Sequence, residues 1–155
     1  MTGTSPAREL DIIVCGASGF VGKLLADYLV KHAPEGTKIG LGGRSLEKLA
    51  ATRADLGTAA ADLPLIIADA DDATALKALA QRTRVVATTV GPYAKYGHAL
   101  VHECASAGTH YVDLTGEVLF HRESIDDNHE LAVSTGAKIV HSCGFDSIPS
   151  DLGVH

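Results

Sequence analysis

The stretch Leu10-Asp-Ile-Ile-Val-Cys-Gly-Ala-Ser-Gly-Phe-Val-Gly-Lys-Leu-Leu25 contains an apolar run, a glycine-rich turn and the beginning of a helix. Residues 10–15 are rich in β-branched side chains, which is typical of a strand buried on both faces of a parallel sheet. Gly16 then allows a tight turn, Gly19 allows the backbone to approach a diphosphate, and Gly22 allows the helix to pack closely. The stretch therefore predicts a turn that binds a dinucleotide.

The start of the helix adds the electrostatic part of this prediction. A helix N-terminus offers unpaired N–H groups and the positive end of its dipole, both of which favour phosphate. The spacing has one residue more than the common G-x-G-x-x-G pattern, but the glycines follow a strand and open a helix, as that pattern requires. A plain turn without ligand is the alternative, although three flexible glycines in seven residues favour the ligand. The predicted phosphate contacts are Gly16, Ala17, Ser18, Gly19, Phe20, Val21 and Gly22.

Length and composition limit the classes of protein to consider. The chain has 155 residues, 46% of them hydrophobic and 21% charged, which suits one globular domain. A net charge of −6 argues against nucleic acid as a partner. No apolar run approaches the ~20 residues of a membrane span. Three widely spaced cysteines without C-x-x-C spacing indicate reduced thiols, so we expect a cytoplasmic protein.

Hydrophobic periodicity and turn residues predict alternating strands and helices. We expect strands at 10–15, 38–41, 65–68, 85–90, 110–114 and 138–142, and helices at 20–32, 46–56, from 73 onward, 99–107 and 120–134. Ser45 and Asp72 are the expected caps of the second and third helices. This pattern predicts an α/β fold with a doubly wound parallel sheet of six strands and helices on both faces, the Rossmann fold. Right-handed crossovers give the order 3-2-1-4-5-6, with the ligand crevice at the carboxyl end of the first strand.

The ends of the chain suggest its domain organisation. Residues 1–9 are polar and are expected to form a flexible leader, and residues 10–150 the dinucleotide-binding domain. Residues 151–155 are expected to begin a further substrate or catalytic domain of a longer polypeptide.

The end of the second predicted strand indicates which dinucleotide binds. NAD-binding domains usually place an acidic residue there to bind the ribose 2′-hydroxyl, whereas this chain has Gly42-Gly-Arg-Ser45. Arg44 offers a planar set of donors suited to a 2′-phosphate, and Ser45 adds a hydroxyl. The alternative is that Arg44 is a solvated charge and Ser45 only a helix cap. We expect NADP(H) as the cofactor.

Further candidate contacts follow the next strands. Asp69 comes after the third strand, where the adenine should lie, but it is equally typical of a solvated loop acid. Val90, Gly91, Pro92 and Tyr93 follow the fourth strand, where the chain passes the nicotinamide half. Tyr93 would stack near the nicotinamide or cover the core. The segments 115–117 and 143–147 also follow strands and are expected at the nicotinamide end or near substrate.

The sequence gives little support for a metal site or for a catalytic acid–base pair. His98, His102 and Cys104 lie close in sequence, but no third or fourth ligand has a recognisable metal-site spacing, so we predict no metal. No tyrosine is followed four residues later by the lysine that short-chain dehydrogenases use. We name no catalytic residue in this chain.

Several motifs together resemble a known family. They are Gly16-Ala-Ser-Gly-Phe-Val-Gly22, Gly42-Gly-Arg-Ser45, Val90-Gly-Pro-Tyr93, Tyr111-Val-Asp-Leu-Thr-Gly-Glu117 and Cys143-Gly-Phe-Asp-Ser-Ile-Pro-Ser-Asp-Leu-Gly153. Nearly the whole chain resembles the saccharopine dehydrogenase-like oxidoreductases and, within them, the mycobacterial trans-acting enoyl reductases. Members are about three times as long, so the resemblance implies an N-terminal nucleotide-binding domain.

The resemblance implies NADPH-dependent reduction of an enoyl C=C bond in polyketide-derived lipids, in trans to a polyketide synthase. The substrate would be a small molecule or a lipid acyl group, and the isolated domain would be inactive. Two alternatives stay open: an imine reductase of the saccharopine reductase type, and a non-catalytic sensor or scaffold that binds NADP(H). A homo-oligomer, and membrane association of a longer protein, also stay open.

Overall fold

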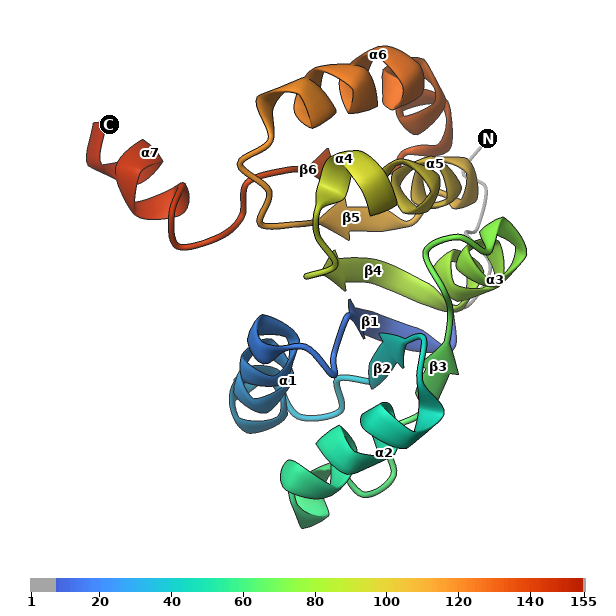
Figure 1. Ribbon diagram of the computed structural model, residues 1–155, viewed down its shortest axis with the longest axis vertical. Helices are drawn as coiled ribbons and strands as arrows, with labels where there is room; N and C mark the ends of the chain where they lie inside the picture. The colour runs from blue at the N-terminus through green and yellow to red at the C-terminus, as the bar shows by residue number, and fades with distance from the viewer. Residues whose placement is uncertain (1–7, 155) are drawn as a thin grey trace.

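A parallel sheet of six strands forms the middle of the molecule (Figure 1). The computed structural model describes residues 8–154. The strands are β1 Leu10–Cys15, β2 Ile39–Gly43, β3 Leu65–Ile67, β4 Thr83–Thr88, β5 His110–Val112 and β6 Ile139–Val140. Their order is β3-β2-β1-β4-β5-β6, and each neighbouring pair is parallel. Both findings confirm the predicted doubly wound fold.

Helices cover both faces of this sheet, as predicted. They are α1 Phe20–His32, α2 Leu46–Asp55, α3 Ala73–Arg82, α4 Tyr93–Tyr96, α5 His98–Ala107, α6 Val118–Thr135 and α7 Ile148–Val154, with a 3₁₀ turn η1 Thr58–Ala60. Successive strand residues face opposite sides. Val14 of β1 packs with Leu41 and with residues of α1 and α2 in one core cluster. Its neighbour Ile13 packs with residues of α3 and α5 in the other.

Because the strands are parallel, their carboxyl ends meet at one edge of the sheet. Figure 1 shows this edge on the side where α1 begins and where α7 stands apart from the sheet. The loops that follow β1, β2, β3 and β4 therefore come together there. This is the crevice position in which doubly wound sheets bind ligands.

The structure differs from the sequence prediction mainly around short elements. The fourth strand is Thr83–Thr88, not 85–90, because its pairing with β5 ends at Ala87 and the N–H of Val90 bonds to Thr88 Oγ1 (3.2 Å). Neither α4 nor α7 was predicted as a helix. The first has four residues, too few for a periodic pattern, and the second contains Pro149 and Gly153, which are poor helix formers.

The chain ends differ in part from the predicted organisation. Residues 1–7 of the predicted leader and His155 lie outside the described residues. Arg8 and Glu9 do not belong to a free leader, because Arg8 donates to the carbonyls of Ala80 and Ala107 and Glu9 pairs with Arg82 at 2.8 Å. α7 crosses the boundary expected at residue 150. No helix in residues 8–154 is long and apolar enough to cross a membrane.

Candidate cofactor site

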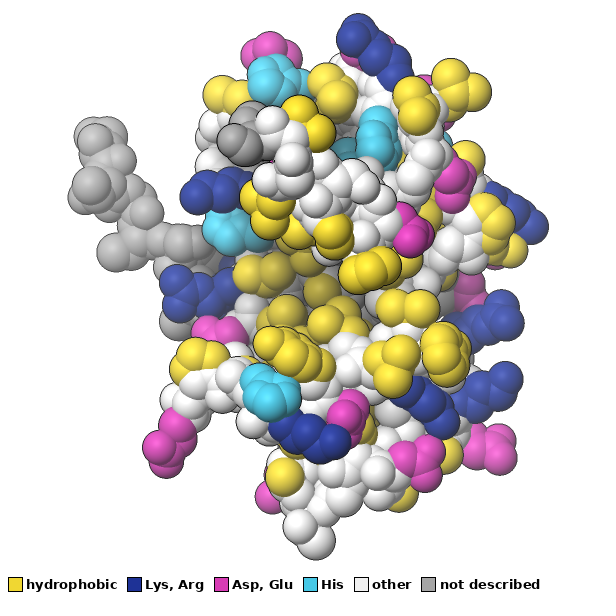
Figure 2. Space-filling model, turned by 90° about the vertical axis from the view of Figure 1, so that its left-hand side faces the viewer, with side chains coloured by type: hydrophobic (Ala, Val, Ile, Leu, Met, Phe, Trp, Pro, Cys, Tyr) yellow, Lys and Arg dark blue, Asp and Glu magenta, His cyan; other side chains and the backbone are white. Residues whose placement is uncertain are grey.

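A cleft of about 400 Å³ opens at the carboxyl edge of the sheet, between the loops after β1, β2, β3 and β4. Of the predicted site residues, Gly16, Ser18, Gly19, Arg44, Asp69, Val90 and Gly91 line it. Figure 2 shows the side of the molecule on which the strands end, and hydrophobic side chains gather near the middle of this face. The cleft thus combines the candidate phosphate contacts with an apolar interior, in which Leu76, Leu79 and Leu100 form part of the wall.

The glycine turn after β1 has the geometry that the sequence predicts. Gly16 has φ +79°, in the left-handed region, and a Cβ there would lie 2.8 Å from Thr89 Oγ1. Its N–H donates to the carbonyl of Gly42 (2.9 Å), which holds the turn against β2. A Cβ on Gly22 would lie 2.0 Å from the Gly16 carbonyl oxygen. Both the tight turn at Gly16 and the close helix packing at Gly22 are confirmed.

The first turn of α1 leaves backbone donors free beside this turn. Gly19 is the N-cap, makes no side-chain cap bond, and accepts the first helical bond from the N–H of Lys23 (2.9 Å). Within residues 8–154, the N–H groups of residues 20–22 have no hydrogen-bond partner, and the turn carries no acidic residue. Phe20 is 82% exposed and Ala17 is fully buried, and neither side chain lines the cleft. Phe20 and the half-exposed Val21 can therefore offer an anion only their backbone N–H groups, whereas the N–H of Ala17 already donates to the carbonyl of Gly42 (3.1 Å).

Arg44 and Ser45 lie where β2 passes into α2. The exposed side chain of Arg44 lines the cleft and makes no hydrogen bond or ion pair with any described residue. Ser45 Oγ accepts from the N–H of Lys48 (3.3 Å), which confirms Ser45 as the N-cap of α2. The guanidinium is thus available to an anion, and the hydroxyl can still donate its own proton.

Asp69 lies at the cleft, as expected for an adenosine contact, and is also a solvent-exposed loop acid, which was the alternative interpretation. Its side chain is exposed at the cleft, and Oδ1 accepts from the N–H of Asp71 (3.1 Å) in a local turn. Asp72 caps α3 by accepting from the N–H of Ala75 (3.0 Å), as predicted. Asp69 as an adenosine contact stays a prediction.

Tyr93 is a core residue, so its ring is not free to stack on a nicotinamide. The side chain is 6% exposed, packs near Phe120, and donates its hydroxyl proton to the carbonyl of Thr88 (3.2 Å). Burial raises the pKa of the Tyr93 phenol to about 12. Of the two interpretations of Tyr93, the structure agrees with the one in which it covers the core. Pro92 is exposed as the N-cap of α4 and does not line the cleft.

Sequence reasoning missed several residues that line the cleft. Thr89, the first residue after β4, bonds through Oγ1 to the Cys15 carbonyl (3.2 Å) and forms part of the wall. Tyr96 reaches the cleft from α4, the helix that periodicity could not reveal. Cys15 also lines the cleft, and burial raises the pKa of its thiol to about 12, so it is present there as a small buried hydrophobic side chain and not as a nucleophile.

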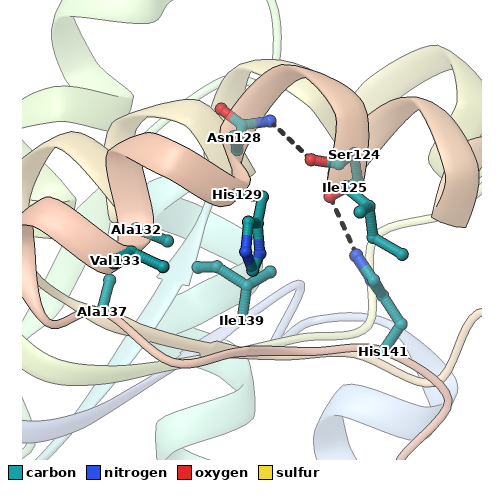
Figure 3. Close-up of a pocket in the computed structure, with 9 residues that line it drawn as sticks. All are labelled: Ser124, Ile125, Asn128, His129, Ala132, Val133, Ala137, Ile139 and His141. Carbon is teal, nitrogen blue, oxygen red and sulfur yellow. Dashed lines mark hydrogen bonds between the residues drawn. The ribbon is translucent and has the colours of Figure 1, made fainter.

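A second pocket, of about 240 Å³, lies between α6 and β6 at the edge of the sheet (Figure 3). His141 Nε2 lies 2.9 Å from Ser124 Oγ, and His141 Nδ1 lies 2.7 Å from Asp113 Oδ2. The order of atoms matches a serine hydrolase triad. Ser124, however, is 2% exposed in the middle of α6, where backbone N–H groups are committed to the helix and none can stabilise an oxyanion. We interpret this network as structural.

Comparison with known proteins shows which family the chain matches and which relatives it is similar to. Residues 12–140 match the family described as the saccharopine dehydrogenase NADP binding domain. The chain is 56% identical over 152 residues to a trans-acting enoyl reductase of Mycobacterium bovis, covering 97% of this chain and 36% of that protein. It thus spans about a third of the length of such relatives.

Solved structures agree on the fold. Apo saccharopine dehydrogenase (L-Glu forming) from Saccharomyces cerevisiae has a TM-score of 0.73 at 20% identity, covering 94% of this chain and 29% of that one. A Citrobacter sp. triphenylmethane reductase complexed with NADP(H) has a TM-score of 0.61 at 18% identity, covering 85% of this chain and 48% of that one.

Proposed function

Because the chain belongs to the saccharopine dehydrogenase NADP-binding domain family, we propose that its cleft binds NADPH for an enoyl reductase. The observation that carries the proposal is the pairing of a bare glycine turn with Arg44 in one cleft. A Cβ at Gly16 would lie 2.8 Å from Thr89 Oγ1, so glycine at this position lets the loop after β4 pack directly against the turn. The free N–H groups at the start of α1 would hold that diphosphate.

Arg44 would select the phosphorylated cofactor. Its guanidinium can bind a 2′-phosphate with two parallel hydrogen bonds, whereas a carboxylate at the end of β2 would repel that phosphate. Ser45 would add a hydroxyl donor, and Asp69 would border the adenosine. The cofactor in the triphenylmethane reductase structure is likewise NADP(H), which supports this choice.

The loop after β4 would border the nicotinamide half. With the diphosphate at β1 and the adenosine toward β2 and β3, the other half must pass toward β4. Val90 and Gly91 line the cleft at that point, and Gly91 presents no side chain. Pro92 and Tyr93 would act by fixing the shape of this turn.

When bound, NADPH would supply a hydride to the β-carbon of an enoyl thioester, and a proton would then add at the α-carbon. The residues described here would hold the cofactor and exclude water from its apolar side. We propose that the substrate is a polyketide-derived acyl group presented by a separate synthase, as the resemblance of the sequence motifs implies. The name of the 56% identical relative supports an enoyl reductase that acts in trans. Residues of the remaining two thirds of the relatives' length would supply the acyl pocket and the proton donor.

Titration of the 155-residue chain with NADPH and with NADH tests the binding part. We expect saturable binding of NADPH, weaker binding of NADH, and no turnover. A matched assay with a full-length homologue and an enoyl thioester should show stereospecific consumption of NADPH. Turnover of imines but not enoyl thioesters would favour the imine reductase, and binding without turnover by the full-length protein would favour a sensor or scaffold.

A further inference from the structure

Glu117 joins the loop after β5 to the loop after β4. Its two carboxylate oxygens accept from the backbone N–H groups of Tyr93 (2.7 Å) and Ala94 (2.8 Å). These are the first two residues of α4, whose N-terminal donors have no partner within so short a helix. Glu117 lies 24 residues farther along the chain, at the N-cap of α6. The start of α4, and with it the turn at Gly91 and Pro92, is therefore placed by a side chain from another loop.

The loop that carries Glu117 is itself held in place by hydrogen bonds. Its own N–H donates to Thr115 Oγ1 (3.0 Å), and the Thr115 carbonyl accepts from Ser142 Oγ (2.7 Å). Asp113 Oδ1 accepts from the N–H groups of Thr115 and Ser142, both at 3.1 Å. Asp113 Oδ2 accepts from the hydroxyl of Tyr111 (2.9 Å). The loops after β4, β5 and β6 are thus connected by one run of hydrogen bonds through two carboxylates.

The chemistry of the residue explains why a carboxylate is present at 117. Two adjacent N–H groups that point in one direction require two acceptors, which an ionised carboxylate supplies in one planar group. Hydrogen bonds to an ionised acceptor are roughly twice as strong as neutral ones. A glutamine at this position would place an N–H₂ group against one of the two donors.

We propose that Glu117 is a positioning residue for the nicotinamide half of the cofactor. It acts through the backbone of Tyr93 and Ala94 to hold the turn at residues 90–92 in the shape that borders the bound nicotinamide. It does not touch the adenosine half, which lies beyond β1 toward β2 and β3. The inference rests on the proposed binding of NADPH.

Two ligands allow the adenosine half and the nicotinamide half of the site to be tested separately. Adenosine 2′,5′-bisphosphate tests the part around Arg44, and NADPH tests the whole cleft. For Glu117→Gln we expect the Kd for NADPH to rise about tenfold, because a turn that Glu117 no longer holds must be ordered when the cofactor binds. The Kd for adenosine 2′,5′-bisphosphate should stay within about twofold, because Glu117 holds only the β4 loop. Glu130→Gln, at an exposed glutamate of the same helix, is the control and should change neither affinity.

A second measurement uses the unmodified chain. The amide resonances of Tyr93 and Ala94 should shift on addition of NADPH but not on addition of adenosine 2′,5′-bisphosphate. Unchanged affinity for NADPH in Glu117→Gln, or a parallel loss for both ligands, would overturn the inference. So would amide shifts with adenosine 2′,5′-bisphosphate as large as those with NADPH. Failure of the unmodified chain to bind either ligand would overturn the proposed function itself.

Discussion

Replacing Gly22 by alanine tests how closely α1 must approach the glycine turn. The added Cβ would lie 2.0 Å from the Gly16 carbonyl oxygen, 2.7 Å from the Gly16 carbonyl carbon and 2.9 Å from Ala17 Cα. All three atoms belong to the backbone, so no side chain can rotate away. Overpacking of this kind costs about 1–3 kcal/mol, and we expect the upper part of that range. The gain of about 1 kcal/mol from alanine's helix propensity offsets only part of it, so the net loss should be about 2 kcal/mol.

Urea unfolding followed by far-UV circular dichroism measures this loss directly. Gly153→Ala is the matched control, because Gly153 is also helical and a Cβ there meets no atom within 4 Å. The control should unfold at the same urea concentration as the unmodified chain or at a slightly higher one. Gly22→Ala with unchanged stability would refute the close packing described here. We also expect folded Gly22→Ala protein to bind NADPH more weakly, because the new Cβ must displace either Gly16 or the first turn of α1.

Two further substitutions test the buried polar groups around the site. Asp113→Asn should lower stability by about 2–4 kcal/mol at pH 7, because the buried side chain then presents a donor to groups that donate to it. Although burial acts to raise the pKa of Asp113, hydrogen bonds from His141 and from the N–H groups of Thr115 and Ser142 hold this pKa below the ordinary value of an aspartate. The difference in unfolding free energy between the unmodified chain and Asp113→Asn should therefore be largest above about pH 5, and it should decrease as the pH falls through the folded-state pKa of Asp113. A difference that stays constant down to pH 3 in urea titrations would contradict a lowered pKa for Asp113. Tyr93→Phe should lower the free energy of unfolding by about 1 kcal/mol in the same urea titrations, because the carbonyl of Thr88 loses a buried hydrogen-bond donor. If the free energy of NADPH binding changes by more than the free energy of unfolding, Tyr93 must contact the cofactor directly, which would contradict its place in the core.

Much of the fold follows from local sequence signals. The β-branched run at residues 10–15 and the caps Ser45 and Asp72 each act within a few residues. Right-handed crossovers then leave one strand order, which the structure confirms. Gly16 and Gly22 are likewise predictable, because their roles depend on the chain immediately around them.

The parts of the site that sequence reasoning missed depend on distant contacts. Tyr93 is in the core because Phe120 and the carbonyl of Thr88 surround it, and neither contact shows in the sequence around residue 93. Glu117 was expected near the ligand, yet its carboxylate binds backbone groups 23 and 24 residues earlier in the chain. α4 carries Tyr96 into the cleft but is one turn long, so periodicity could not detect it.

The ratio of NADPH to NADH affinity in Arg44→Ala, relative to the unmodified chain, tests the central claim most directly. Arg84→Ala is the control, since Arg84 is also exposed but lies near the opposite end of β4 and outside the cleft. We predict that Arg44→Ala weakens NADPH binding by about 1.5–3 kcal/mol, roughly 10- to 150-fold, and leaves NADH binding unchanged. An equal loss for both cofactors, or no loss for either, would contradict the assignment of Arg44 to the 2′-phosphate.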